Sequence, residues 1–162
     1  MTAAIKTADP APGEHGGLDG GLRVLAVYER GRNGERTLRE AAELATAGAR
    51  LTVVTLATQA PRQRCCAAAS GAYNLAMRDE AADELREARL LLGAVAERVR
   101  FVMLVERRDP PLALWAAESG FDLVLVPARR FSRGGGIVAR ALRRSAASEV
   151  RLIGQPSSAP LG

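Results

Sequence analysis

The chain has 162 residues, of which 48% are hydrophobic and 25% are charged. This length corresponds to about one domain with its own core, and the composition excludes a disordered chain. The net charge of +5 comes almost entirely from arginine, because Lys6 is the only lysine among 23 basic residues. The apolar runs are only a few residues long, so the sequence predicts no membrane insertion.

The two cysteines of the chain, Cys65 and Cys66, are adjacent. Neighbouring cysteines close no long loop, so they are not expected to form a stabilising disulfide. The first residues carry one lysine and no continuous apolar core, so no secretory signal is expected. These features predict a cytoplasmic protein. The thiols lie near Arg62 and Arg64, and plain unpaired thiols and redox sensing are both open for them.

Both ends of the chain are predicted to be flexible tails. Residues 1–20 contain four glycines and two prolines, and they lack an apolar run able to nucleate packing. Residues 155–162 contain two prolines and two serines after the last apolar run. One α/β domain is expected between them, over residues 21–154.

Within this domain, short runs rich in valine, leucine and isoleucine alternate with helical stretches. Strands are expected at residues 22–28, 50–57, 99–105, 122–128 and 149–153. Helices are expected at residues 34–47, 74–97, 110–119 and 137–146. The strand runs lack strict polar alternation, which is typical of parallel strands covered on both faces. The sequence therefore predicts a single-domain, open, doubly wound α/β sheet of five mainly parallel strands with helices on both faces.

Local residues support these boundaries. Gly48 and Gly120 stand where the first and third helices must stop. Asp109 precedes two prolines and is expected to cap the third helix. In the second helix, Leu75, Leu85 and other apolar residues recur at helical spacing and predict the face that packs on the sheet.

Candidate ligand-binding residues follow the first and fourth strands, because ligands of such sheets bind beyond the carboxyl ends of strands where the strand order reverses. The first loop contains Tyr28 and Glu29. The second loop contributes Arg129, Arg130, Ser132, Arg133, Gly134, Gly135 and Gly136. Glycine N–H groups before a helix, next to arginines, fit a phosphate or another anion. A solvated surface loop without a ligand is the alternative.

The domain resembles the universal stress protein family. The stretch VERRDPPLALWAAESGFDLVLVP at residues 105–127 has the family's order of strand, polar turn, helix and hydrophobic strand opened by aspartate. RVLAV at residues 23–27, with the polar loop and alanine-rich helix that follow, is similar to the family's first strand and helix. The resemblance covers residues 22–153 and implies an adenine nucleotide alpha hydrolase-like fold.

The nucleotide-binding residues of that family are not matched. Nucleotide-binding members carry an aspartate at the end of the first strand, where this chain has Tyr28. They carry G-x2-G-x9-G-S/T after the fourth strand, whereas this chain has Ala128 at the first expected glycine and three consecutive glycines later. The resemblance therefore implies the fold without standard ATP binding. Neither a cofactor nor a metal site is expected.

The leading hypothesis is a non-enzymatic, dimeric, universal-stress-type module of stress response or signalling. The domain has no histidine to activate Ser132 as a nucleophile. One alternative is a nucleotide-binding protein or slow ATPase that uses Gly134, Gly135 and Gly136 in a non-standard way. Another is a regulatory interaction domain with a protein partner, such as a transporter or kinase. Nucleic-acid binding is not expected, because Phe131 is the only aromatic residue among the arginines of residues 129–144.

A homodimer is expected through the last strand. In this topology the strand lies at a sheet edge, and an uncovered apolar edge is an association site. The predicted interface residues are Val150, Arg151, Leu152 and Ile153. Family members that resemble this chain pair through the same strand.

Overall fold

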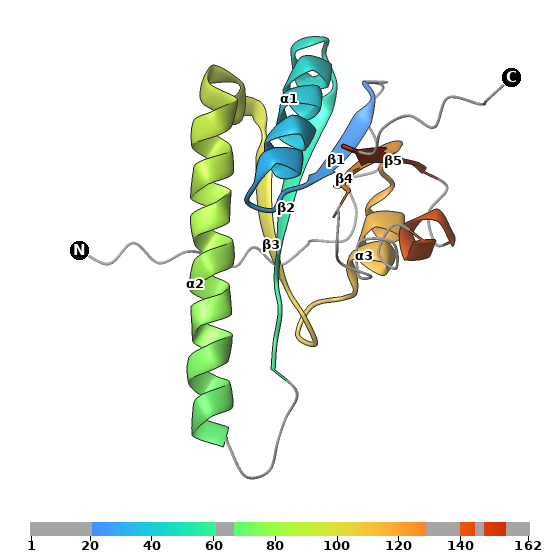
Figure 1. The fold of residues 1–162 in the computed structure, drawn as a ribbon. Helices are drawn as coiled ribbons and strands as arrows, with labels where there is room; N and C mark the ends of the chain where they lie inside the picture. The colour runs from blue at the N-terminus through green and yellow to red at the C-terminus, as the bar shows by residue number, and fades with distance from the viewer. Residues whose placement is uncertain (1–20, 61–66, 129–139, 145–147, 155–162) are drawn as a thin grey trace, which may run out of the picture.

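The computed structural model describes residues 21–60, 67–128, 140–144 and 148–154. These residues contain a sheet of five strands that all run parallel (Figure 1). The strands are β1 (Arg23–Val27), β2 (Arg50–Ala57), β3 (Arg100–Val105), β4 (Leu123–Pro127) and β5 (Glu149–Ile153). Their spatial order is β3-β2-β1-β4-β5, which confirms the predicted open parallel sheet.

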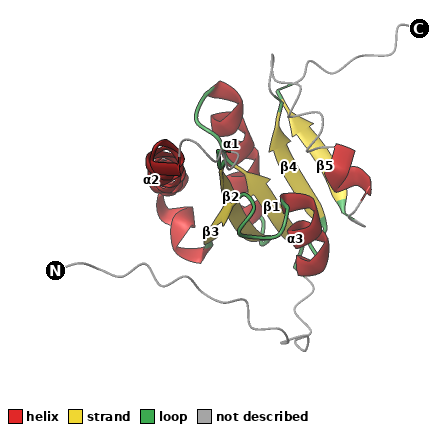
Figure 2. Cartoon of the chain, turned by 90° about the horizontal axis from the view of Figure 1, so that it is seen from below, coloured by secondary structure: helices red, strands yellow, loops and turns green. Residues whose placement is uncertain are grey.

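Helices cover both faces of the sheet. They are α1 (Arg32–Thr46), α2 (Ala67–Leu92) with the short 3-10 helix η1 (Gly93–Arg98) after it, and α3 (Leu112–Ser119). Residues 140–144 are also helical. Figure 2 shows α1 and α2 on one face, and α3 with the short red helix beside β5 on the other. The doubly wound arrangement is therefore confirmed.

Alternate residues of the central strand β1 supply two separate apolar cores. Val24 and Ala26 face α1 and α2, and Leu25 and Val27 face α3. Val24, Leu25 and Ala26 are fully buried, because β1 has a strand on each side and a helical layer on each face. This explains why the strand runs are apolar without alternation.

The strand order reverses at β1. The chain steps from β1 to β2 and β3 in one direction, and β4 and β5 lie on the other side. Leu25 pairs with Thr52 of β2 and with Val124 of β4. The carboxyl ends of β1 and β4 are therefore neighbours, and they form the switch point at which ligands of open α/β sheets bind.

The second helix differs from its predicted range. It begins at Ala67 instead of residue 74 and ends at Leu92, where Gly93 adopts a positive φ of 55°. A helix of 26 residues is about 39 Å long, whereas the eight residues of β2 extend about 26 Å. The amino-terminal part of α2 therefore runs past the sheet (Figure 1). Leu75, predicted to pack on the sheet, is 61% exposed for this reason.

The helix ends agree with the sequence in two of three cases. Gly48 has a φ of 101° two residues after the end of α1, and Gly120 closes α3 in the left-handed conformation. The predicted cap of α3 is wrong, since Pro111 occupies the N-cap position and no side chain caps the helix. Asp109 instead closes the turn after β3, because its carboxylate accepts a hydrogen bond of 2.7 Å from the Val105 N–H.

Several predicted features fall outside the described residues. These are the tails at residues 1–20 and 155–162, and Cys65 and Cys66. Among the residues that the structure does describe, no helix is both long enough and apolar enough to span a bilayer.

Candidate functional site

The candidate site lies at the carboxyl ends of β1 and β4. Of the predicted site residues, Tyr28 and Glu29 are described, directly after β1. The predicted glycine-rich loop after β4 falls outside the described residues, and this applies to Arg129, Arg130, Ser132, Arg133, Gly134, Gly135 and Gly136. The described part of the site therefore consists of the loop after β1, the start of α1, and the residues that end β4 and β5.

Tyr28 is a core residue. Its side chain is 1% exposed and packs in the apolar cluster that joins β1 to α1 and α2. Its buried hydroxyl lies close to the Glu87 carboxylate, although the two do not meet the geometry of a standard hydrogen bond. Burial raises the pKa of the Tyr28 phenol, and the nearby Glu87 and Glu84 carboxylates raise it further. The phenol therefore stays neutral at physiological pH, with its ring inside the protein.

Arg30 fastens the loop after β1 to α2. Its Nε donates a hydrogen bond of 2.8 Å to the Glu87 carboxylate, and its backbone N–H donates one of 3.0 Å to Glu84. The bond from Arg30 lowers the pKa of Glu87, whereas burial raises the pKa of Glu84. The Arg30–Glu87 pair is half exposed, so it contributes little stability and mainly positions the loop.

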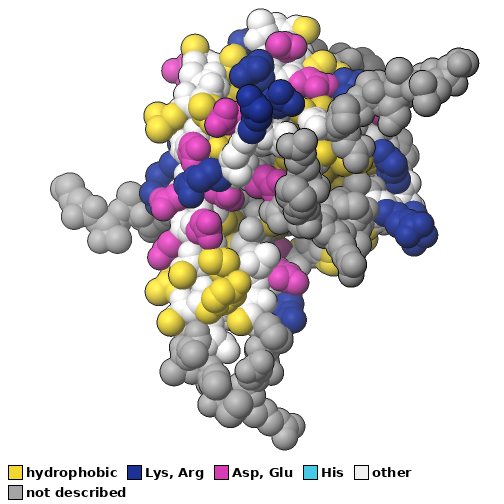
Figure 3. Space-filling view, viewed as in Figure 1, with side chains coloured by type: hydrophobic (Ala, Val, Ile, Leu, Met, Phe, Trp, Pro, Cys, Tyr) yellow, Lys and Arg dark blue, Asp and Glu magenta, His cyan; other side chains and the backbone are white. Residues whose placement is uncertain are grey.

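The two glutamates were not expected to contribute to the site. In the sequence they belong to a helix face of mixed charge, typical of a solvated surface. Figure 3 shows this mixture, with acidic and basic side chains interspersed over α1 and α2. Only the fold reveals that two of these acids face the loop that follows β1.

Asn33 connects the two sides of the switch point, at the carboxyl ends of β1 and β4. It belongs to the first turn of α1, and its side-chain amide donates a hydrogen bond to the carbonyl of Ala128 after β4. The Thr37 hydroxyl donates to the Asn33 carbonyl at 2.8 Å. Gly154, after β5, has a φ of 97°, and a Cβ there would lie 2.4 Å from the Asn33 Oδ1. One side chain thus joins the elements that follow β1, β4 and β5.

Gly34 permits the tight turn that returns the chain into α1. A Cβ at this position would lie 1.8 Å from the Glu29 carbonyl oxygen and 3.3 Å from the Tyr28 ring. Only glycine allows so close an approach of two backbone segments. The turn therefore sets the position of both Tyr28 and Asn33.

These contacts tie the loop after β1 to α2 and tie the start of α1 to the residue after β4, so they close the gap between the carboxyl ends of β1 and β4. The donors that the site presents, on Arg30 and Asn33, already have acceptors within the protein. In the described part of the chain, no three His, Cys, Asp or Glu side chains are grouped so that they could hold a metal ion.

Comparison with known proteins identifies the family. The model of the universal stress protein family matches residues 22–153. The chain belongs to the universal stress protein family. This confirms the resemblance inferred from the sequence over the same residues. A comparison with curated protein sequences gives no match.

Solved structures of universal stress proteins share the fold. UspA from Lactobacillus plantarum has a TM-score of 0.68 at 15% identity, covering 82% of this chain and 97% of that chain. The Archaeoglobus fulgidus protein in complex with dAMP has a TM-score of 0.58 at 24% identity, covering 82% and 97%. A universal stress protein in complex with cAMP has a TM-score of 0.55 at 21% identity, covering 81% and 95%. At these identities the likeness shows the adenine nucleotide alpha hydrolase-like fold alone.

Proposed function

We propose that this universal stress protein is a non-enzymatic, cytoplasmic, homodimeric module of stress response or signalling that does not bind ATP in the standard way. The observation that carries the proposal is the hydrogen bond from Asn33 to the Ala128 carbonyl. It spans the switch point, where a nucleotide would enter between the loops after β1 and β4. A bound nucleotide would have to displace this link.

Tyr28 supports the same proposal. It stands where nucleotide-binding family members carry an aspartate, and its side chain is 1% exposed. A buried neutral phenol offers a ligand neither a carboxylate acceptor nor an accessible surface. The part of the site that would select a nucleoside is therefore lacking at the end of β1.

Weak anion binding is the activity we assign to the loop after β4. Arg129, Arg130 and Arg133 supply positive charge, and the three consecutive glycines before the following helix can offer backbone N–H groups. Such a site suits phosphate or sulfate. Its affinity falls as salt increases, because attraction between exposed charges is screened.

Dimerisation is assigned to β5, which lies at the edge of the sheet. The N–H of Glu149 and the carbonyl of Ile153 form hydrogen bonds on the side of β5 that faces β4. Backbone groups of successive residues point to opposite sides of a strand, so the Leu152 N–H points away from β4, to the side without a neighbouring strand. Val150 and Leu152 are partly buried against the α3 core. A strand with unpaired backbone groups on one side and apolar side chains is suited to pair with the same strand of a second copy.

A nucleotide-binding protein or slow ATPase is the second candidate. The observation that favours it is that two proteins of the same fold were solved with dAMP and cAMP. Mass spectrometry of small molecules released from freshly purified protein distinguishes the two candidates. The proposed function requires no stoichiometric nucleotide and no hydrolysis of added ATP above a protein-free control, and either finding would favour the second candidate.

A further inference from the structure

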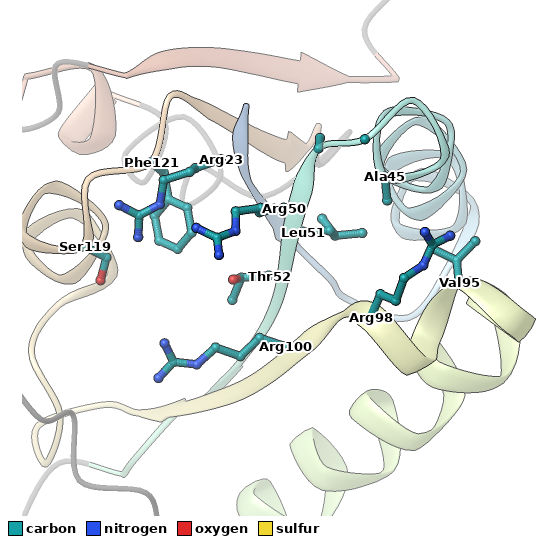
Figure 4. Close-up of a pocket in the computed structure, with 12 residues that line it drawn as sticks. Arg23, Ala45, Arg50, Leu51, Thr52, Val95, Arg98, Arg100, Ser119 and Phe121 are labelled. Atoms are coloured by element: carbon teal, nitrogen blue, oxygen red, sulfur yellow. The ribbon is translucent and has the colours of Figure 1, made fainter. Parts of the chain in front are cut away.

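A second potential site lies at the amino ends of the strands, opposite the edge described above. A pocket of about 540 Å³ opens there, and four arginines line it, namely Arg23, Arg50, Arg98 and Arg100 (Figure 4). None of the described residues that line it is acidic. The pocket is thus a basic cavity on a surface that otherwise carries both acidic and basic side chains, and it is separate from Asn33 and Tyr28.

The sheet brings three of these arginines together. Arg23 of β1 and Arg50 of β2 are direct partners in the parallel ladder. Arg100 of β3 pairs with Thr52, which lies two residues after Arg50 and therefore on the same face of β2. All three project to the face that carries α3, because their neighbours Val24, Leu51 and Phe101 belong to the opposite core. Register alone therefore creates a row of three guanidinium groups.

The close-up supports this arrangement. Figure 4 shows the side chains of Arg23, Arg50 and Arg100 extending to the same side, toward Ser119 at the end of α3. Arg98, the last residue of η1, extends instead toward Val95 and Ala45. The row of three, together with the Ser119 hydroxyl, forms the polar wall of the pocket, and Arg98 is peripheral to it.

These three guanidinium groups have no carboxylate partner in the part of the chain that the structure describes. By contrast, Arg30 and Arg151 form ion pairs with glutamates. The Arg23 guanidinium lies over the Phe121 ring at 5.7 Å, and the Asp122 carboxylate nearby accepts the Arg23 backbone N–H. Like charges on paired positions of neighbouring strands repel each other. A bound anion would remove that repulsion.

We propose that this pocket binds a small molecule that carries two or more phosphate groups. Guanidinium groups bind phosphate oxygens in a planar, bidentate manner. These three start from three neighbouring strands, which lie about 4.8 Å apart, so together they span more than one phosphate group. The volume lies within the range of small-molecule sites. Phe121 is buried beneath Arg23, so the described residues that line the pocket offer no exposed ring on which nucleic-acid bases could stack.

Calorimetry with inorganic tripolyphosphate tests the proposal. The test variant is Arg50→Gln with Arg100→Gln, which removes two charges from the row. The matched control is Arg36→Gln with Arg39→Gln, which removes two exposed charges from α1 and so lowers the net charge equally. A second control, Arg129→Gln with Arg133→Gln, removes charge from the loop of the proposed function. Single-stranded oligonucleotide is titrated in parallel as a competing class of ligand.

We expect the test variant to weaken tripolyphosphate binding by about tenfold or more and the α1 control to change it by less than about threefold. The Arg129 and Arg133 control should remove only the weaker heats of the loop after β4 and leave the tighter site in place. Without ligand, the test variant should melt at or above the temperature of the wild type, because repulsion is reduced. The single variant Arg50→Gln, expected to lose several-fold in affinity, serves if the double variant does not fold.

Three outcomes would overturn the proposal. The first is equal loss in the test variant and the α1 control, which would indicate net charge alone. The second is loss confined to the Arg129 and Arg133 control, which would place the binding at the carboxyl edge. The third is tight binding of oligonucleotide with none of tripolyphosphate. None of these outcomes depends on whether ATP binds at the other edge.

Discussion

Replacing Gly34 with alanine should destabilise the fold by about 3 kcal/mol. The new Cβ would lie 1.8 Å from the Glu29 carbonyl oxygen, far inside van der Waals contact. The obstructing atom belongs to the backbone, so a change of rotamer cannot relieve the overlap. The start of α1 must move away from β1, which loosens the packing of Tyr28 and the link from Asn33 to Ala128.

Gly71→Ala is the matched control. Gly71 lies in α2, is exposed, and a Cβ there would meet nothing within 4 Å. The same chemical change should therefore stabilise the protein by about 0.5–1 kcal/mol through helix propensity alone. The two glycine-to-alanine changes are thus expected to have opposite effects on the free energy of unfolding.

Thermal and urea unfolding followed by circular dichroism measure both effects. For a domain of this size, a loss of about 3 kcal/mol lowers the melting temperature by roughly 6–12 °C. A Gly34→Ala variant as stable as the wild type would refute the argument, since it would show that the turn after β1 has room for a side chain.

Three further changes test other parts of the account. Leu152→Pro removes an N–H on the open side of β5 and should convert the dimer to monomer by light scattering, and a dimer that persists at micromolar protein would contradict the assignment. Changing Cys65 and Cys66 to serine should shift the melting temperature by less than about 2 °C, and a loss of many degrees would contradict the view that the thiols are dispensable. Tyr28→Phe removes a buried hydroxyl that lies beside the Glu87 carboxylate without a hydrogen bond of standard geometry. It should raise the free energy of unfolding by about 1 kcal/mol in urea titrations, whereas a loss of that size would mean that the hydroxyl is hydrogen-bonded to Glu87 in solution.

The sheet was predictable from the sequence because its strands are buried on both faces. The runs at residues 50–57 and 149–153 match β2 and β5 at both ends. The start of α2 was not predictable in the same way. Its first turns run past the sheet and are rich in alanine and other small residues, so they carry no apolar periodicity.

The site was less predictable, because its decisive contacts join distant parts of the chain. Asn33 and Ala128 are 95 residues apart, and Arg30 and Glu84 are 54 residues apart. Nothing near Asn33 in sequence indicates its partner. The arginines that open β1, β2 and β3 are likewise unremarkable singly, and they form a row only through the register of the sheet.

Calorimetric titration with ATP and magnesium at near-physiological ionic strength tests the central claim most directly. In the Arg50→Gln, Arg100→Gln background, which removes the proposed polyphosphate pocket, the closed link at Asn33 and the buried Tyr28 predict at most weak heats for ATP, comparable to those for phosphate or sulfate. These heats should fall steeply as salt is added, because they depend on charge alone. In that background, a dissociation constant in the low micromolar range that survives Arg129→Ala and Arg133→Ala would contradict the account and indicate a nucleotide site at the carboxyl edge of the sheet.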